Sequence, residues 1–123
     1  MVKASSESME MSLQIRIAGN FIERARGLLF SEPLPEGHFL YIPNCRSVHT
    51  FGMRYPLIVI FLDQEGHVLH VYQNVKPMRI VSCLSAWAVC ETMWRPGKGH
   101  DTLDFTQLEV ALARSLERNR KRK

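Results

Sequence analysis

Residues 57–75 read LIVIFLDQEGHVLHVYQNV, and this stretch decides the fold. Residues 57–62 are continuously apolar, whereas a strand with one solvent face would alternate, so we expect a strand that is buried on both faces. The polar link at 63–66 ends in Gly66, which supplies the positive φ that a hairpin turn needs. Residues 67–75 then form the return strand of a β-hairpin. Its two predicted faces carry Leu69, Val71 and Val75 on one side and Val68, His70 and Tyr72 on the other.

Further strands are predicted on both sides of this hairpin. Residues 13–17 alternate apolar and polar side chains, which indicates a strand with one buried face. Residues 38–42 and 47–53 are short runs that end near prolines, and 85–93 is a later run of the same kind. The sequence therefore predicts a mainly β domain.

Two helices complete the prediction. Residues 21–30 carry apolar side chains at helical spacing and predict a short helix. A second helix is predicted at 106–119, where Thr106 and Glu109 match a capping box. An i, i+4 stripe follows from Leu108 through Leu112 to Leu116.

The chain length fits one domain, because 123 residues cannot build two separate cores. Residues 1–11 are polar and aperiodic, and we expect them to be disordered. Residues 12–101 form the single β-rich domain, and 102–123 form the C-terminal helix with its basic tail. The predicted fold class is α+β: a small, mainly β, partly closed barrel-like sheet with a short N-terminal helix and a C-terminal helix.

The net charge of +4 is concentrated at the carboxyl end. Residues 114–123 carry six Lys and Arg against one acid, and residues 1–113 have a net charge of −1. The body therefore lacks the basic face that nucleic-acid recognition needs. We expect at most weak attachment to nucleic acid or anionic surfaces, through the tail residues Arg118, Arg120, Lys121, Arg122 and Lys123.

Hydropathy and cysteine usage favour a cytoplasmic location. No stretch approaches the ~20 apolar residues that span a bilayer, and the amino end lacks the apolar run of a secretory signal. A chain whose signal had been removed would look the same. The three cysteines, Cys45, Cys83 and Cys90, lack CxxC spacing and favour reduced thiols. A bridge between Cys83 and Cys90 is the alternative for an exported chain.

Several motifs together resemble the bacterial and archaeal family called domain of unknown function 192. They are RARGLL at 24–29, HTFGMR at 49–54, PL at 56–57, FLD at 61–63 with GHV at 66–68, and Glu91. The resemblance covers about residues 13–98. It implies a small, barrel-like, mainly β domain with short helices, and it implies no established activity. Ile58 stands where the family often has an acidic residue, and the helix after Asp101 looks like an extension particular to this chain.

The segment HTFGMRYP at 49–56 is the candidate binding surface. Gly52 would permit close approach of a ligand, while Phe51, Met53 and Tyr55 offer apolar contacts. His49 and Arg54 could orient a polar or anionic group. The alternative is that Phe51 and Met53 belong to the core and that Gly52 marks a bulge.

Two charged residues elsewhere join the candidate ligand-binding set. Arg24 lies on the predicted short helix, and Glu91 lies on a late predicted strand. The alternative to ligand binding by Arg24 is a salt bridge between Arg24 and Glu91. The sequence thus favours a non-enzymatic module that binds a small ligand or another protein. The alternative is an enzyme with His49 as acid or base, assisted by Glu91 or Asp63; no catalytic residue is assigned.

No metal or cofactor is predicted. Cys45, His49 and Met53 are soft ligands at intervals of four, but four residues of a strand span ~13 Å, too far for a shared ion. Cys45 and His49 could also be considered as a thiol nucleophile and its base, but the sequence places no carboxylate to orient the histidine. A buried, inert cysteine is the simpler interpretation.

Overall fold

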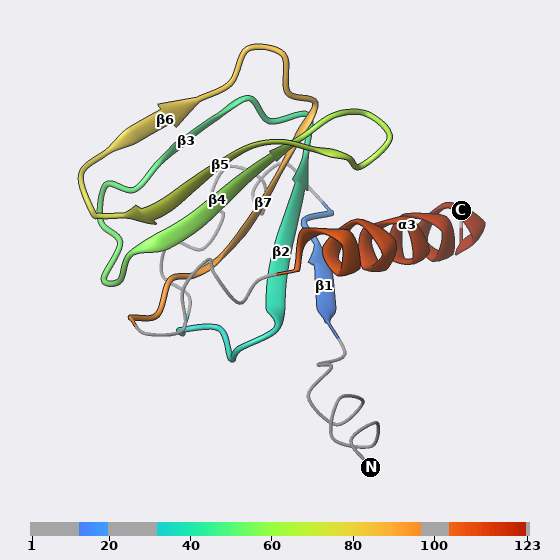
Figure 1. Ribbon diagram of the computed structural model, residues 1–123, viewed down its shortest axis with the longest axis horizontal. Coiled ribbons are helices and arrows are strands. Elements are labelled where there is room, and N and C mark those ends of the chain that lie inside the picture. The colour runs from blue at the N-terminus through green and yellow to red at the C-terminus, as the bar shows by residue number, and fades with distance from the viewer. Residues whose placement is uncertain (1–12, 20–31, 97–103, 123) are drawn as a thin grey trace.

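The computed structural model describes residues 13–19, 32–96 and 104–122 (Figure 1). In chain order, the described elements are β1 (Gln14–Ile17), β2 (His38–Pro43), β3 (Ser47–His49), β4 (Leu57–Leu62), β5 (Val68–Val75), β6 (Ile80–Ser82), β7 (Ala88–Met93) and α3 (Phe105–Arg122). Strands outnumber helices among these elements, so the predicted mainly β, α+β class is confirmed.

The strands form two separate sheets. The larger sheet has the order β1-β2-β7-β4-β5, in which β1 and β2 run parallel and the other neighbours run antiparallel. The smaller sheet pairs β3 with β6. The predicted barrel-like closure is wrong, because β1 and β5 remain the outer strands and the two short strands pair with each other instead of joining them.

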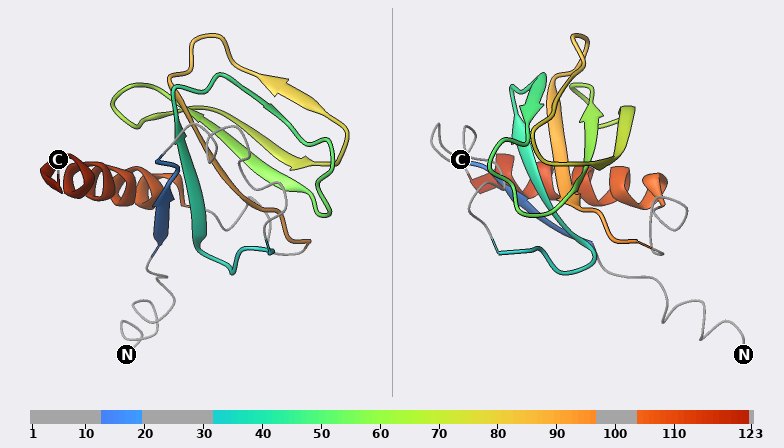
Figure 2. Two further views of the ribbon diagram at one scale, coloured as in Figure 1. Left: turned by 180° about the vertical axis from the view of Figure 1, so that it is seen from behind. Right: turned by 90° about the vertical axis from the view of Figure 1, so that its left-hand side faces the viewer.

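Side chains of the large sheet point alternately into two hydrophobic cores, one on each face of the sheet, so the expectation of a single core is wrong. Every residue of β4 is buried, which confirms a strand covered on both faces. One face, including Leu57, Val59 and Phe61, packs under the β3–β6 sheet and the loop after β3. The other face, including Ile60, packs under α3. Figures 1 and 2 show α3 and the β3–β6 sheet on opposite sides of the molecule.

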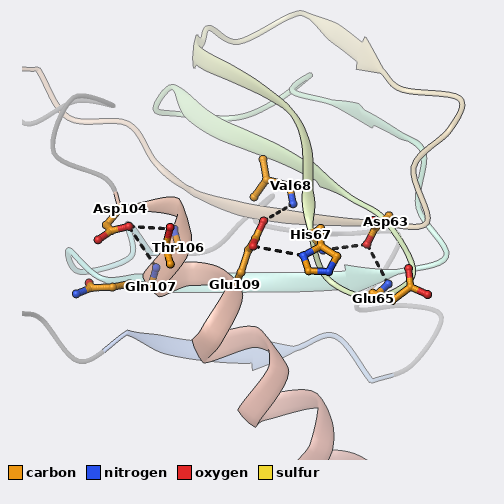
Figure 3. Close-up of polar contacts among 8 residues, drawn as sticks. All are labelled: Asp63, Glu65, His67, Val68, Asp104, Thr106, Gln107 and Glu109. Atoms are coloured by element: carbon orange, nitrogen blue, oxygen red, sulfur yellow. Dashed lines mark hydrogen bonds and ion pairs between the residues drawn. The ribbon is translucent and has the colours of Figure 1, made fainter.

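The predicted hairpin is present as β4 and β5. Gly66 has a φ of 89°, and the carboxylate of Asp63 accepts hydrogen bonds from the backbone N–H groups of Glu65 and His67, both at 2.9 Å (Figure 3). The predicted division of β5 into two faces is wrong. Two register shifts between β4 and β5 interrupt the alternation, so Val71 packs in the core under α3 while Val75 packs in the opposite core.

Helix α3 is longer than predicted and begins differently. The carboxylate of Asp104 accepts from the backbone N–H groups of Thr106 and Gln107, at 3.0 and 3.3 Å, so Asp104 is the N-terminal cap. The predicted capping box is therefore wrong. Glu109 reaches across to the hairpin instead, where it accepts from the Val68 N–H at 2.8 Å (Figure 3).

The predicted leucine stripe joins α3 to the large sheet. Leu108 and Leu112 are fully buried, and Leu116 packs beside them. The stripe is thus confirmed as the core-facing side of the helix.

Three other predicted strands differ in their bounds. The run at 47–53 is a strand only at Ser47–His49, because the chain turns at residues 50–53 with Gly52 at a φ of 84°. The run at 85–93 pairs only from Ala88, and β2 extends to Pro43. Strand β6 was not predicted, since three residues carry too short a pattern to be recognised.

Some predictions fall on other parts of the chain. The disordered segment at 1–11 and the helix at 21–30, with Arg24, lie outside the described residues. Cys83 and Cys90 pack in different cores, so the alternative bridge between them is wrong. Within the described ranges, no helix is long and apolar enough to cross a membrane.

Candidate functional site

The buried hydroxyl of Thr50 fixes the loop after β3 to the chain after β5. Thr50 is fully buried, and its Oγ1 donates to the Lys76 carbonyl at 2.7 Å and accepts from the Arg79 N–H at 2.9 Å. Its own N–H donates to the Arg79 carbonyl at 2.9 Å, and its carbonyl accepts from Met53 and Met78. The side chain and the backbone of Thr50 together therefore join residues 50–53 to residues 76–79.

This arrangement presents an aromatic pair to solvent. The Phe51 N–H donates to Nδ1 of His49 at 3.3 Å, and the two rings lie 5.2 Å apart. Phe51 is 43% exposed although it follows the buried Thr50, because the chain reverses at Gly52. The turn thus leaves Phe51 outside the core.

Two further apolar side chains lie beside this pair. Ile80 pairs with His49 across the small sheet and is 63% exposed, while Val48 and Val81, the next pair, point into the core. Met78, whose N–H donates to the Thr50 carbonyl, is 65% exposed. We call His49, Phe51, Met78 and Ile80 the outer face.

The segments that form the outer face are basic. Residues 43–56 and 76–87 contain Arg46, Arg54, Lys76 and Arg79 and no aspartate or glutamate. All four basic residues are exposed. The segments that carry the outer face therefore add positive charge and no negative charge to the surface around it.

Other residues of the HTFGMRYP segment lie inside the protein. Met53 and Tyr55 are buried in the core beneath the β3–β6 sheet. The Tyr55 hydroxyl donates to the Glu32 carbonyl at 3.4 Å. The pKa of Tyr55 is raised, first by burial and then by the nearby negative charge of Glu91, which places these two candidate residues close together.

Glu91 occupies the centre of the large sheet. It is buried on β7, between Leu40 of β2 and Val59 of β4. Its carboxylate also raises the pKa of Cys90, although burial is the larger cause. The structure thus brings Glu91 to Tyr55 on the inside, and it brings His49 to Phe51 on the outside.

The remaining charged candidates are spread over the molecule. Arg54 is exposed in the loop before β4, and Arg24 lies outside the described residues. Asp63 lies at the hairpin turn, before the start of β5. His49 lies near the other end of β5, because its neighbour Thr50 forms a hydrogen bond with Lys76 there. Eight residues of strand span ~26 Å, so His49 and Asp63 are not arranged as a catalytic pair.

Sequence reasoning missed Met78 and Ile80. Their signal was the segment KPMRIVS at 76–82, in which apolar and basic residues mix without an acid or a clear period. Pairing with β3 turns that irregular segment into part of the outer face.

The fold and the outer face define a small α+β domain with an exposed apolar and basic surface. Within the described ranges, no group of three or more His, Cys, Asp or Glu residues is placed to hold a metal ion. Comparison with known proteins agrees with the motifs. The chain belongs to the DUF192 family, described as "Uncharacterized ACR", whose model matches residues 2–95. A UPF0127 protein of Pyrococcus horikoshii is 36% identical over 83 residues, which cover 65% of this chain and 71% of that protein.

Two solved structures share the fold. A protein of unknown function from Novosphingobium aromaticivorans is 20% identical, with a TM-score of 0.59 over 66% of this chain, which spans only 63% of that protein's length. A putative transcription regulator from Sinorhizobium meliloti is 17% identical, with a TM-score of 0.60 over 66% of this chain and 68% of that one. Both likenesses concern the fold alone.

Proposed function

We propose that this chain is a non-enzymatic protein-binding module that uses its outer face to bind an acidic segment of another protein. The observation that carries the proposal is the exposure of three large apolar side chains, Phe51, Met78 and Ile80, on one acid-free surface. Contiguous exposed apolar groups are costly in water and mark interaction surfaces. Phe and Met are also among the residue types enriched at protein interfaces.

The backbone at Met78 supports the same proposal. Met78 has a φ of 68°, in the left-handed region that costs a non-glycine residue about 1–2 kcal/mol. Strained backbone is found preferentially at functional sites. Here the residue in the strained conformation carries a large apolar side chain that is mostly exposed to solvent.

The charge around the outer face selects the partner. Arg46, Arg54, Lys76 and Arg79 would attract carboxylates and repel a second copy of the same surface. An acidic protein segment with apolar side chains satisfies both the charge and the apolar strip. Nucleic acid satisfies only the charge, since contacts to phosphates come from polar and basic groups rather than from Met and Ile.

Catalysis by His49 is less well supported by the geometry. Nδ1 of His49 accepts a hydrogen bond from the Phe51 N–H, Asp63 is at the far end of the hairpin, and Glu91 is buried within the sheet. Neither carboxylate is placed to orient the imidazole, as a general acid or base requires.

The proposal is tested with selection from a displayed peptide library on the immobilised full chain. We expect enrichment of peptides that combine Asp or Glu with large apolar residues, and loss of binding when their acids are replaced by Gln. Enrichment of basic peptides, or of none, contradicts the proposal. Binding of a labelled DNA duplex that outcompetes the selected peptides points instead to nucleic acid.

Matched variants locate the binding surface. Phe51→Ser and Leu69→Ser remove apolar side chains of nearly equal exposure, 43% and 42%, and Leu69 lies on β5 away from the outer face. Phe51→Ser should weaken peptide binding at least about tenfold, as loss of an interface residue worth more than ~1.4 kcal/mol does, and Leu69→Ser should not. Met78→Gly should abolish binding without loss of stability, because glycine relieves the strained φ. Equal binding by all three variants would refute the assignment.

A further inference from the structure

A cleft of about 520 Å³ lies between β1, the end of β2 and the last turns of α3. It is lined by Ile17, Ala18, Gly19, Tyr41, Pro43, Asn44, Gln64, Trp87, Leu116, Asn119 and Arg120. This volume is within the range of ~300–1,000 Å³ that is typical of small-molecule sites.

The apolar part of the lining suits a flat ligand. Trp87 supplies aromatic surface, and Ile17 and Leu116 supply aliphatic surface from β1 and α3. Aromatic rings stack in offset or edge-on arrangements, so Trp87 favours a planar partner.

The polar part of the lining is cationic and donor-rich. Arg120 brings a guanidinium group, and Asn44, Gln64 and Asn119 bring amides, while none of the lining residues that the structure describes is an aspartate or glutamate. A guanidinium matches the geometry of a carboxylate and binds it with two parallel hydrogen bonds. The cleft thus favours an anionic group at its rim.

Tyr41 can supply a further hydrogen-bond donor. Its side chain is only 1% exposed, and it belongs to the lining of the cleft. Burial, and to a smaller extent the charge of Cys90 as a thiolate, raises the pKa of Tyr41 to about 12, so the hydroxyl remains a donor at neutral pH.

We propose that this cleft binds a small organic anion with a flat apolar body, which lies against Trp87 while Arg120 and the Tyr41 hydroxyl hold its anionic group. An aromatic carboxylate is the simplest ligand of this kind. The site depends on α3, which lies beyond the family-matched residues 2–95, so it is particular to chains that carry this helix.

A neighbouring hollow extends the basic surface. It has a volume of about 480 Å³ and shares Ile17 and Asn119 with the cleft, and it adds Ile15, Ser115 and Arg118. A ligand with a second polar group can therefore reach Arg118 without leaving the surface of α3.

The proposal is tested with two probes on the full chain. The first is 8-anilinonaphthalene-1-sulfonate, a flat aromatic anion, and the second is N-phenyl-1-naphthylamine, which has the same rings without the sulfonate. We expect saturable binding of the anion at one site and at least about tenfold weaker binding of the neutral probe, the cost of one lost charged hydrogen bond. In a Trp94→Phe background, the anion should quench the emission of Trp87.

Variants of the lining separate the cleft from general surface binding. Arg120→Gln should weaken the anionic probe about tenfold and leave the neutral probe unchanged, whereas Arg114→Gln, on the same helix but outside both hollows, should change neither. Tyr41→Phe should weaken binding of the anion about threefold or more, because one hydrogen bond to the ligand is lost. Equal binding of both probes, or binding that is unchanged in the Arg120 and Tyr41 variants, indicates nonspecific binding and overturns the proposal. None of these results depends on the outer face.

Discussion

Replacement of Thr50 by valine tests whether one hydroxyl group holds the outer face in place. Valine has nearly the shape of threonine, so the change removes the donor to Lys76 and the acceptor for Arg79 without opening a cavity. Each buried group that loses its hydrogen-bond partner costs about 1–3 kcal/mol. Lys76 and Arg79 are themselves exposed residues, so water can reach their backbone in part, and we expect a total loss of about 2–3 kcal/mol.

Urea unfolding of matched variants measures this loss. Thr50→Ser keeps the hydroxyl and loses one methyl group, which costs about 1 kcal/mol, so serine should be the more stable of the two variants. Thr50→Val should also weaken peptide binding at the outer face, because two of the hydrogen bonds that join the loop after β3 to residues 76–79 would be lost. A valine variant as stable as the unmodified chain, or more stable than the serine variant, would refute the role given to this hydroxyl.

Two further predictions concern the attachment of α3. Leu112→Ala should cost about 2–5 kcal/mol of unfolding free energy, because Leu112 is fully buried between the helix and the sheet, while Val110→Ala, at a 46% exposed position of the same helix, should cost under ~1 kcal/mol; a similar loss for both in urea melts would contradict the packing. The Val68 N–H that bonds Glu109 lowers the pKa of its carboxyl in the folded state, against a smaller opposing effect of burial. The resulting stabilisation is complete above the ordinary pKa of about 4.5 and is lost as the pH falls through the lowered value. The stability difference between the unmodified chain and Glu109→Gln should therefore shrink from pH ~6 to pH ~3, and a constant difference would argue against this contact.

Local patterns in the sequence predicted the elements whose signals are long or whose chemistry is specific. The unbroken apolar run at 57–62 predicted a strand buried on both faces, and Gly66 predicted the turn that follows. Cross-chain contacts could not be predicted in the same way. Glu109 matched a capping box at the level of sequence, but its carboxylate found the Val68 N–H, 41 residues away, and Asp104 took over the cap.

The candidate site was predicted as one segment, and the fold divides that segment. Alternation along 49–55 could not reveal that the chain turns at Gly52, and this turn leaves Phe51 in solvent while Met53 and Tyr55 enter the core. The other residues of the outer face, Met78 and Ile80, are distant from Phe51 in the sequence. The pairing of β3 with β6 brings their segment to the segment of Phe51. The placement of Glu91 beside Tyr55 likewise depends on the order of the strands rather than on any local motif.

The position of α3 has a consequence for the family as a whole. The matched residues end at 95, yet the helix that seals Ile60, Leu62 and Cys90 from water begins at Phe105. A relative without an equivalent helix would expose an apolar surface. That surface would have to be buried by self-association or by binding to another polypeptide. Subunit number measured across the family should therefore vary with the presence of this C-terminal helix.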